Sequence, residues 1–278
     1  MRLTVAVKAV FPVALVLTTA SASGSNNFTN NILITGYWPP TNEGVRQFSQ
    51  NLDQNPGGWQ GGNWRGRGYD IHSYFPEFPD GVGRGVGDFE VDYQDTVADW
   101  ERIVNEVNPV AIITFSRGAR GRNWEIEGQL QMHAPGDWLP DFSEPSLPDA
   151  SMPIFDDLVP GEFYPSTLPT EAIRDAVLDA GIIPNTFIDD AGGGAFLSEL
   201  IGLLGTRHQL LNSGPDAEFR TFAAGHIHVG TRTPDDLTAQ AAEISIETLI
   251  DYLDTVVPAP STVVLMGFGG LIASKRRR

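Results

Sequence analysis

Short apolar runs alternate with amphipathic segments along most of the chain, and this alternation restricts the fold more than any other feature. The apolar runs predict strands at residues 31–36, 69–75, 110–115, 182–188 and 219–229. Apolar residues near helical spacing predict helices at residues 91–107, 170–180, 195–204 and 234–253. Strands and helices in this order predict a three-layer α/β/α sandwich with a largely parallel central sheet.

The segments between these elements are rich in residues that end helices and form loops. Thr170 is expected to cap the N-terminus of its helix, and Gly181 to end that helix. Residues 52–68 contain many Gly, Asn, Trp and Arg and predict a loop. Residues 128–169 are rich in proline and predict a long surface excursion.

The two ends of the chain are typical of export signals. Residues 1–22 combine early cations, the apolar run 9–17 and an Ala-Ser-Ala cleavage site, which predicts a signal peptide; a first core helix is the alternative. Residues 257–278 join a Pro-containing hexapeptide, an apolar run too short to span a bilayer comfortably, and a basic tail. This order resembles the PEP-CTERM sorting signal of Gram-negative bacteria; a plain membrane tail is the alternative. One α/β domain is then expected at residues 23–256.

Charge and composition exclude several classes of function. The chain has 18 Lys+Arg, 35 Asp+Glu and a net charge of -17. Removing the two cations of residues 1–22 and the four of residues 275–278 leaves 12 cations against 35 acids, or -23. Such a domain is a poor nucleic-acid binder. It contains no lysine for a Schiff base or a P-loop, and the chain has no cysteine for a disulfide, a thiolate metal site or a thiol nucleophile.

Candidate chemical groups follow three of the predicted strands, within residues 36–40, 116–127 and 190–198. In open α/β sheets, functional groups gather at the carboxyl ends of strands. Ser198 lies in the first turn of an apolar helix after a triple-glycine turn, where backbone N–H groups favour developing negative charge. This position suits a nucleophile beside an oxyanion hole, and a helix-start serine that satisfies a backbone donor is an equally good interpretation.

Two histidines and two glutamates form pairs whose members are two residues apart in the sequence. His226 and His228 are two residues apart, so both rings face the same side. The pair suits either a metal site or a general base with a packed neighbour, and metal is the weaker option because no third ligand is obvious. Glu125 and Glu127 also share a face, and Arg117, Arg120 and Arg122 just before them favour salt-bridged surface carboxylates.

Four short motifs, in order across residues 31–253, resemble pyroglutamyl peptidase I, a family of cysteine peptidases that remove N-terminal pyroglutamate. Residues 32–39 resemble the opening strand and the loop of the pyroglutamyl pocket. Residues 109–127 resemble the central strand, its turn and the triad glutamate, and residues 191–198 resemble the nucleophile segment with two additional residues. Residues 225–229 resemble the motif of the catalytic histidine.

The resemblance implies a site at specific positions of this chain. It makes Glu127 and His228 the catalytic glutamate and histidine, with Ser198 where the family has cysteine. The implied substrate-binding residues are Tyr37, Trp38 and Pro39; no cofactor and no metal is implied.

Two functions are compatible with the sequence. The first is an exported hydrolase that cleaves an N-terminal pyroglutamyl or other small amide bond with a Ser-His-Glu variant of the triad. The second is a catalytically inactive surface protein that binds a ligand or matrix polymer in the same cleft, with Trp38, Trp59 and Trp64 nearby. The expected partners are a peptide or small amide substrate, signal peptidase and exosortase. Contact with the membrane is expected only in transit to the periplasm, cell surface or extracellular matrix.

Overall fold

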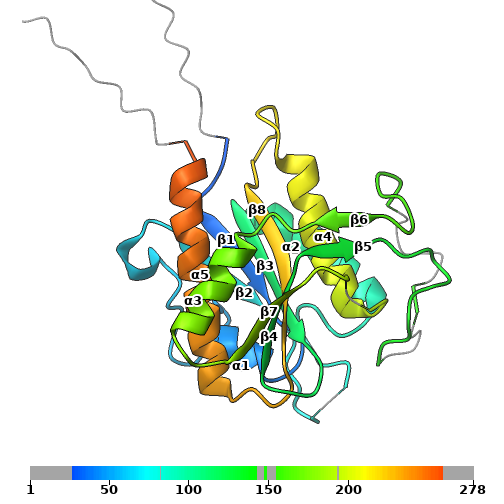
Figure 1. The fold of residues 1–278 in the computed structure, drawn as a ribbon, viewed down its shortest axis with the longest axis horizontal. Coiled ribbons are helices and arrows are strands. Elements are labelled where there is room, and N and C mark those ends of the chain that lie inside the picture. The colour runs from blue at the N-terminus through cyan, green and yellow to red at the C-terminus, as the bar shows by residue number, and fades with distance from the viewer. Residues whose placement is uncertain (1–26, 82, 143–146, 149–154, 193, 259–278) are drawn as a thin grey trace, which may run out of the picture. The chain divides into compact units, whose positions relative to one another are not determined.

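A central sheet with the strand order β2-β1-β3-β8-β4-β7 organises the described part of the chain (Figure 1). The computed structural model describes residues 27–258, except 82, 143–146, 149–154 and 193. The strands are β1 (Asn31–Thr35), β2 (Asp70–Tyr74), β3 (Ala111–Arg117), β4 (Asn123–Glu127), β7 (Asn185–Asp189) and β8 (Ala223–Val229). The predicted signal at residues 1–22, and all but two residues of the one at 257–278, lie outside the described residues.

Most strand pairs are parallel, as the sequence predicts. β2, β1, β3 and β8 run in one direction, whereas β4 is antiparallel to β8 and parallel to β7. The fold is therefore an α/β sandwich with a largely parallel sheet.

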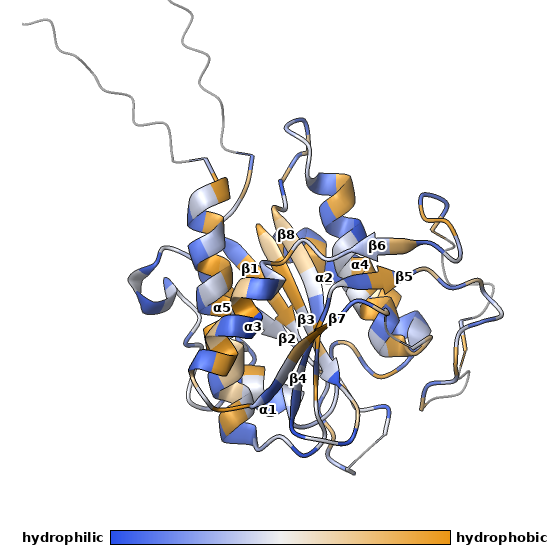
Figure 2. Ribbon diagram, in the orientation of Figure 1, coloured by the Kyte–Doolittle hydropathy of each residue, from blue (hydrophilic) through white to orange (hydrophobic). Residues whose placement is uncertain are grey.

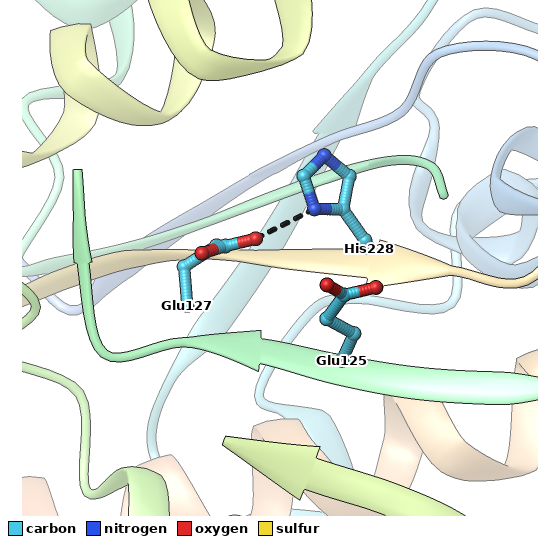
Figure 3. Close-up of side chains that lie close together, drawn as sticks. All are labelled: Glu125, Glu127 and His228. Carbon is cyan, nitrogen blue, oxygen red and sulfur yellow. Dashed lines mark hydrogen bonds and ion pairs between the residues drawn. The ribbon is translucent and has the colours of Figure 1, made fainter. Parts of the chain in front are cut away.

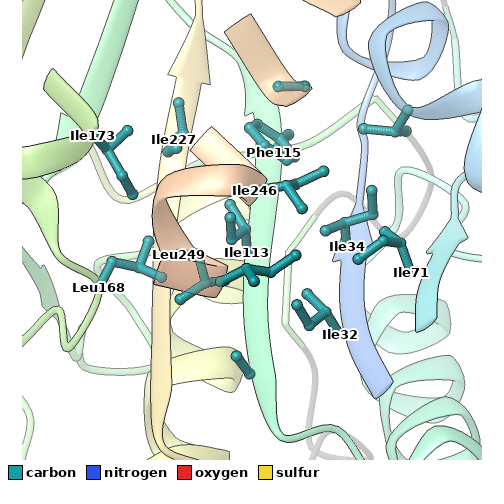
Figure 4. Packing of buried hydrophobic residues seen from close by; sticks show 14 of the residues in the cluster. Ile32, Ile34, Ile71, Ile113, Phe115, Leu168, Ile173, Ile227, Ile246 and Leu249 are labelled. Atoms are coloured by element: carbon teal, nitrogen blue, oxygen red, sulfur yellow. The ribbon is translucent and has the colours of Figure 1, made fainter. Parts of the chain in front are cut away.

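Helices cover both faces of this sheet and bury a separate core on each. One face is covered by α1 (Thr41–Val45), α3 (Thr170–Asp179) and α5 (Asp235–Val256), and the other by α2 (Tyr93–Val107) and α4 (Leu197–Asn212). Alternate strand residues enter the two cores: Ile113 packs with Ile246 and Leu249 of α5 (Figure 4), whereas Ile112 packs on the side of α2 and α4. The helices carry mixed hydrophobic and hydrophilic residues, while the central strands are mostly hydrophobic (Figure 2).

The last strand in the sequence, β8, lies between β3 and β4. Residues 118–122 connect β3 to β4 and pass the end of β8, where backbone hydrogen bonds hold the crossing in place. The N–H of Gly118 donates to the carbonyl of Val229 at 2.8 Å, and the N–H of Gly230 donates to that of Asn123 at 2.9 Å. This arrangement brings the β8 residues beside those of β4.

Several element boundaries differ from those predicted. The N-cap of α3 is Pro169 and not Thr170 as expected, because Thr170 is itself the first residue of the helix. No side chain caps this helix. Gly181, with φ of +68°, follows the helix as expected. β7 begins three residues later than predicted, and α4 begins at Leu197 and extends to Asn212.

The Pro-rich stretch contributes to the core in its described part. It contains β5 (Gln129–Gln131) and β6 (Phe163–Pro165), which pair as a two-stranded antiparallel sheet. Its apolar side chains Trp138, Phe155 and Leu158 are buried in the core on the α2 and α4 side. The segment is therefore not purely a surface excursion, because these apolar residues form part of the core. Within the residues described, no helix is long and apolar enough to cross a bilayer.

Candidate active site

A cavity of about 610 Å³ lies beside the first turn of α4 and collects most of the predicted site residues. Ser198 of α4, His228 of β8 and Glu127 of β4 all line it, together with Tyr37 and Trp38 from the loop after β1. Pro39, also predicted for the binding pocket, is exposed and is not among the lining residues. The cavity thus joins segments that are far apart in the sequence.

The register of β4 and β8 explains why a glutamate and a histidine meet here. Glu125 lies opposite His228 in the antiparallel pair, and Glu127 is two residues farther along on the same face. Glu127 is fully buried, and its Oε1 lies 2.7 Å from Nδ1 of His228 (Figure 3). Because a carboxylate only accepts hydrogen bonds, Nδ1 is the donor, and Nε2 of the neutral ring carries the lone pair.

The neighbouring charges change how His228 titrates. Burial lowers the pKa of His228, but the hydrogen bond to Glu127 and the negative charges of Glu127, Glu125 and Glu199 outweigh it, so the net pKa is raised. The imidazole is therefore a stronger base than an isolated histidine.

Ser198 lies in the first turn of α4, as predicted, and its side chain is partly exposed to the cavity. The N–H groups of Glu199 and Leu200 donate to the carbonyl of Phe196, whereas those of Leu197 and Ser198 have no acceptor among the described residues and are placed to stabilise negative charge. In the part of the chain that the structure describes, no hydrogen bond joins Ser198 to His228.

Glu199, the neighbour of Ser198 in the sequence, is a buried acidic residue that none of the sequence motifs singles out. This carboxylate is fully buried, and its Oε1 accepts a hydrogen bond from the backbone N–H of Gln131 in β5. The bond anchors the first turn of α4, and with it Ser198, to the Pro-rich segment. An acidic residue inside an otherwise apolar helix is the signal that could have identified it.

The aromatic wall of the cavity is rigidly held. The hydroxyl of buried Tyr37 lies 2.5 Å from Oγ1 of Thr96, and Nε1 of Trp38 donates to the carbonyl of Gly83 at 2.8 Å. Trp38 adopts a φ of 60°, a conformation that an L-residue keeps only where its surroundings enforce it. The loop after β1 is therefore fixed by its contacts.

Two other tryptophans expected near the cleft lie elsewhere. Trp59 donates its Nε1–H to the backbone of Ile71, and Trp64 is buried in the core on the α5 side of the sheet. Neither lines the cavity.

His226 packs in the core, as the second interpretation of the pair proposed. It is fully buried, with Nδ1 at 2.7 Å from Oγ1 of Thr114 and Nε2 at 2.8 Å from Oγ of Ser116. Burial lowers its pKa well below the usual value. Both nitrogens are therefore engaged, and a metal site built on His226 and His228 together does not form.

Glu125 lies inside the cavity rather than in a surface salt bridge. It lines the cavity together with Asp189 of β7; burial, followed by the negative charges of Glu127 and Asp189, raises the pKa of Glu125 against the lowering effect of His228. Among the described residues, Arg117, Arg120 and Arg122 form no ion pair with Glu125 or Glu127. The guanidinium of Arg117 instead lies 5.9 Å from the centre of the Trp38 ring.

Comparisons with known proteins place the fold. The structure is similar to pyrrolidone carboxyl peptidase from Thermococcus litoralis, with a TM-score of 0.57 and 19% identity over 82% of this chain and 96% of that one. It is also similar to a mutant pyrrolidone carboxyl peptidase from P. furiosus, with a TM-score of 0.56 and 17% identity over 80% and 99% of the two chains. No family model and no curated protein sequence matches the chain. Pyrrolidone carboxyl peptidase is another name for pyroglutamyl peptidase I, so the fold is the one that the motifs imply.

Proposed function

We propose that this protein is an exported hydrolase that cleaves an N-terminal pyroglutamyl or other small amide bond. Ser198 is the nucleophile, His228 the general base and Glu127 the residue that orients the imidazole. The observation that carries the proposal is the 2.7 Å hydrogen bond between His228 and the buried Glu127 in a cavity that Ser198 also lines.

In the proposed reaction, Oγ of Ser198 bonds to the carbonyl carbon of the amide while its proton moves to Nε2 of His228. The tetrahedral oxyanion is stabilised by backbone N–H groups at the start of α4. Collapse breaks the C–N bond, the leaving amine takes the proton from Nε2, and an acyl-serine ester remains. Water then attacks the ester with the same base, which regenerates Ser198 and releases the acid.

The surroundings of His228 compensate for a hydroxyl nucleophile, which ionises less readily than a thiol. The raised pKa of His228 makes Nε2 a better proton acceptor, and the buried carboxylate of Glu127 stabilises the imidazolium that forms. The aromatic rings of Trp38 and Phe142, with centres 5.3 Å apart, line the same cavity and suit a small planar acyl group.

The test is release of aminomethylcoumarin from its pyroglutamyl amide by the wild type, Ser198→Ala and Ser213→Ala. Ser213 lies exposed at the other end of α4, so its variant controls for loss of a helix serine. We expect Ser198→Ala to lower kcat by about 1,000-fold or more and Ser213→Ala to keep the wild-type rate. Equal rates for the wild type and Ser198→Ala exclude Ser198 as the nucleophile.

A second function is supported by one specific observation. Among the described residues Ser198 makes no hydrogen bond to His228, which is the geometry of a cleft that binds without reacting. The variant Ser198→Cys separates the two functions. Turnover by Ser198→Cys together with an inert wild type supports the ligand-binding protein, whereas turnover by the wild type supports the hydrolase.

A further inference from the structure

Glu125 has no role in the proposed reaction, yet it lies in the cavity wall beside both Glu127 and His228. Ligand atoms of these three residues all lie within 4.8 Å of one another. In Figure 3 the two carboxylates face the Nδ1 side of the imidazole, while Nε2 points away from them. The β4–β8 register fixes this arrangement, because Glu125 and His228 are directly opposite each other.

The cluster has an unsatisfied buried atom. Glu127 is fully buried and one of its oxygens is bound to His228, but Oε2 has no hydrogen-bond partner within the described part of the chain. A buried carboxylate oxygen without a partner is costly, and a bound cation removes this cost. Glu127 and Glu125 together provide up to two negative charges, which one divalent ion neutralises.

We propose that Glu125, Glu127 and His228 form a binding site for a Zn²⁺ ion at the wall of the cavity. Zinc ligands lie about 2.0–2.2 Å from the metal, so two ligand atoms in a tetrahedral site are about 3.4 Å apart. The ligand atoms lie at most 4.8 Å apart, and Nδ1 of His228 lies 2.7 Å from Oε1 of Glu127, so shifts of less than about 1.5 Å bring all separations to that value. Rotation of the partly exposed Glu125 side chain brings its carboxylate closer, whereas the pair of His228 and Glu127 opens slightly.

The donor set selects zinc over the common hard cations. One imidazole nitrogen with two carboxylates suits Zn²⁺, whereas Mg²⁺ and Ca²⁺ prefer oxygen ligands alone. Asp189 of the next strand also lines the cavity, and its negative charge acts on Glu125, so it adds to the attraction of the site for a cation.

Zinc in this site blocks the proposed reaction, an inference that rests on the proposed function. The ion replaces the proton between Nδ1 of His228 and Glu127, and the neutral ring then carries its proton on Nε2. Without a lone pair on Nε2, His228 no longer accepts the proton of Ser198. Zinc bound at this site therefore inhibits the proposed hydrolase.

Calorimetric titration of the purified, chelator-treated protein with ZnCl₂ tests the binding. We expect one Zn²⁺ per chain, no detectable binding of MgCl₂, and at least about tenfold weaker zinc binding by Glu125→Gln. Glu101→Gln is the matched control, because Glu101 is an exposed glutamate on α2, and it is expected to bind zinc like the wild type. Equal affinity of Glu125→Gln and the wild type overturns the proposal, since zinc then binds elsewhere.

Two further measurements keep the test independent of folding and of the proposed function. Crystals of the wild type soaked in ZnCl₂ are expected to give an anomalous peak between Glu125, Glu127 and His228. A peak only at other residues overturns the site, and this result does not depend on whether Glu125→Gln folds. We expect zinc to lower the coumarin-release rate of the wild type. An unchanged or higher rate with zinc bound contradicts the inhibition. Absence of turnover without zinc refutes the hydrolase and leaves the binding result standing.

Discussion

A helical glycine under the candidate nucleophile provides a sharp test of how α4 packs. A Cβ atom added at Gly202 meets Cβ of His226 at 2.9 Å and Cδ2 of Leu130 at 2.9 Å. The Leu130 contact is the end of a flexible side chain, but Cβ of His226 is fixed by the backbone of β8, and hydrogen bonds at both ring nitrogens hold the rest of that side chain. We therefore expect Gly202→Ala to push α4 off β8.

Gly205 in the same helix is the matched control. A Cβ there comes no closer than 3.4 Å to any neighbour, the nearest being Cγ2 of Ile112. Both substitutions gain about 1 kcal/mol in intrinsic helix propensity. Overpacking adds a penalty of about 1–3 kcal/mol only for Gly202→Ala. Because the propensity gain is common to both, the difference in the free energy of unfolding between the variants should be about 2 kcal/mol, with Gly205→Ala the more stable.

Urea denaturation followed by circular dichroism measures this difference, which corresponds to a gap of roughly 1 M in the unfolding midpoints. The same displacement moves Ser198 relative to His228, so the coumarin-release rate of Gly202→Ala should fall while that of Gly205→Ala stays near the wild type. If Gly202→Ala is as stable as Gly205→Ala, the close approach of α4 to β8 is refuted.

Two other predictions concern acid stability and export. Burial, and then the charge of Arg207, lower the pKa of His208 to about 4. The contribution of the neutral ring to stability is therefore complete above pH 6.5 and decreases as the pH falls toward 4. Between pH 7.5 and 5, the free energy of unfolding measured in urea should fall by about 2 kcal/mol more in the wild type than in His208→Gln. Equal decreases in the two proteins refute this. Mass spectrometry of the surface-located protein should show a chain without residues 1–22 and without the C-terminal basic tail, and an intact Arg278 would contradict the proposed sorting.

The layered fold could be predicted from the sequence because its strands are apolar runs bounded by turn residues. Residues 111–115 are buried on both faces, so their composition alone identifies a central strand. The antiparallel direction of β4 could not be predicted, because a local sequence pattern encodes neither the order nor the direction of strands in a sheet. Neither could the burial of Trp138, since a Pro-rich segment gives no periodic signal.

The candidate site was predictable in part. The shared face of Glu125 and Glu127 follows from strand alternation, but its position beside His228 depends on the insertion of β8 next to β4. The same insertion separates the two histidines: His226 lies deep enough to bond Thr114 and Ser116, whereas His228 reaches the cavity. Spacing alone treats the two residues as equivalent.

The position of β8 between β3 and β4 sets the order in which a newly made chain becomes competent. His228 follows Glu127 by 101 positions, so any nascent chain that ends before β8 lacks the proposed base and leaves the facing edges of β3 and β4 without a partner strand. The cavity is thus completed only when nearly the whole domain has emerged, and long-range closure of this kind is slow. If the proposed hydrolase is exported before it folds, it therefore has no activity on the side of the membrane where it is synthesised.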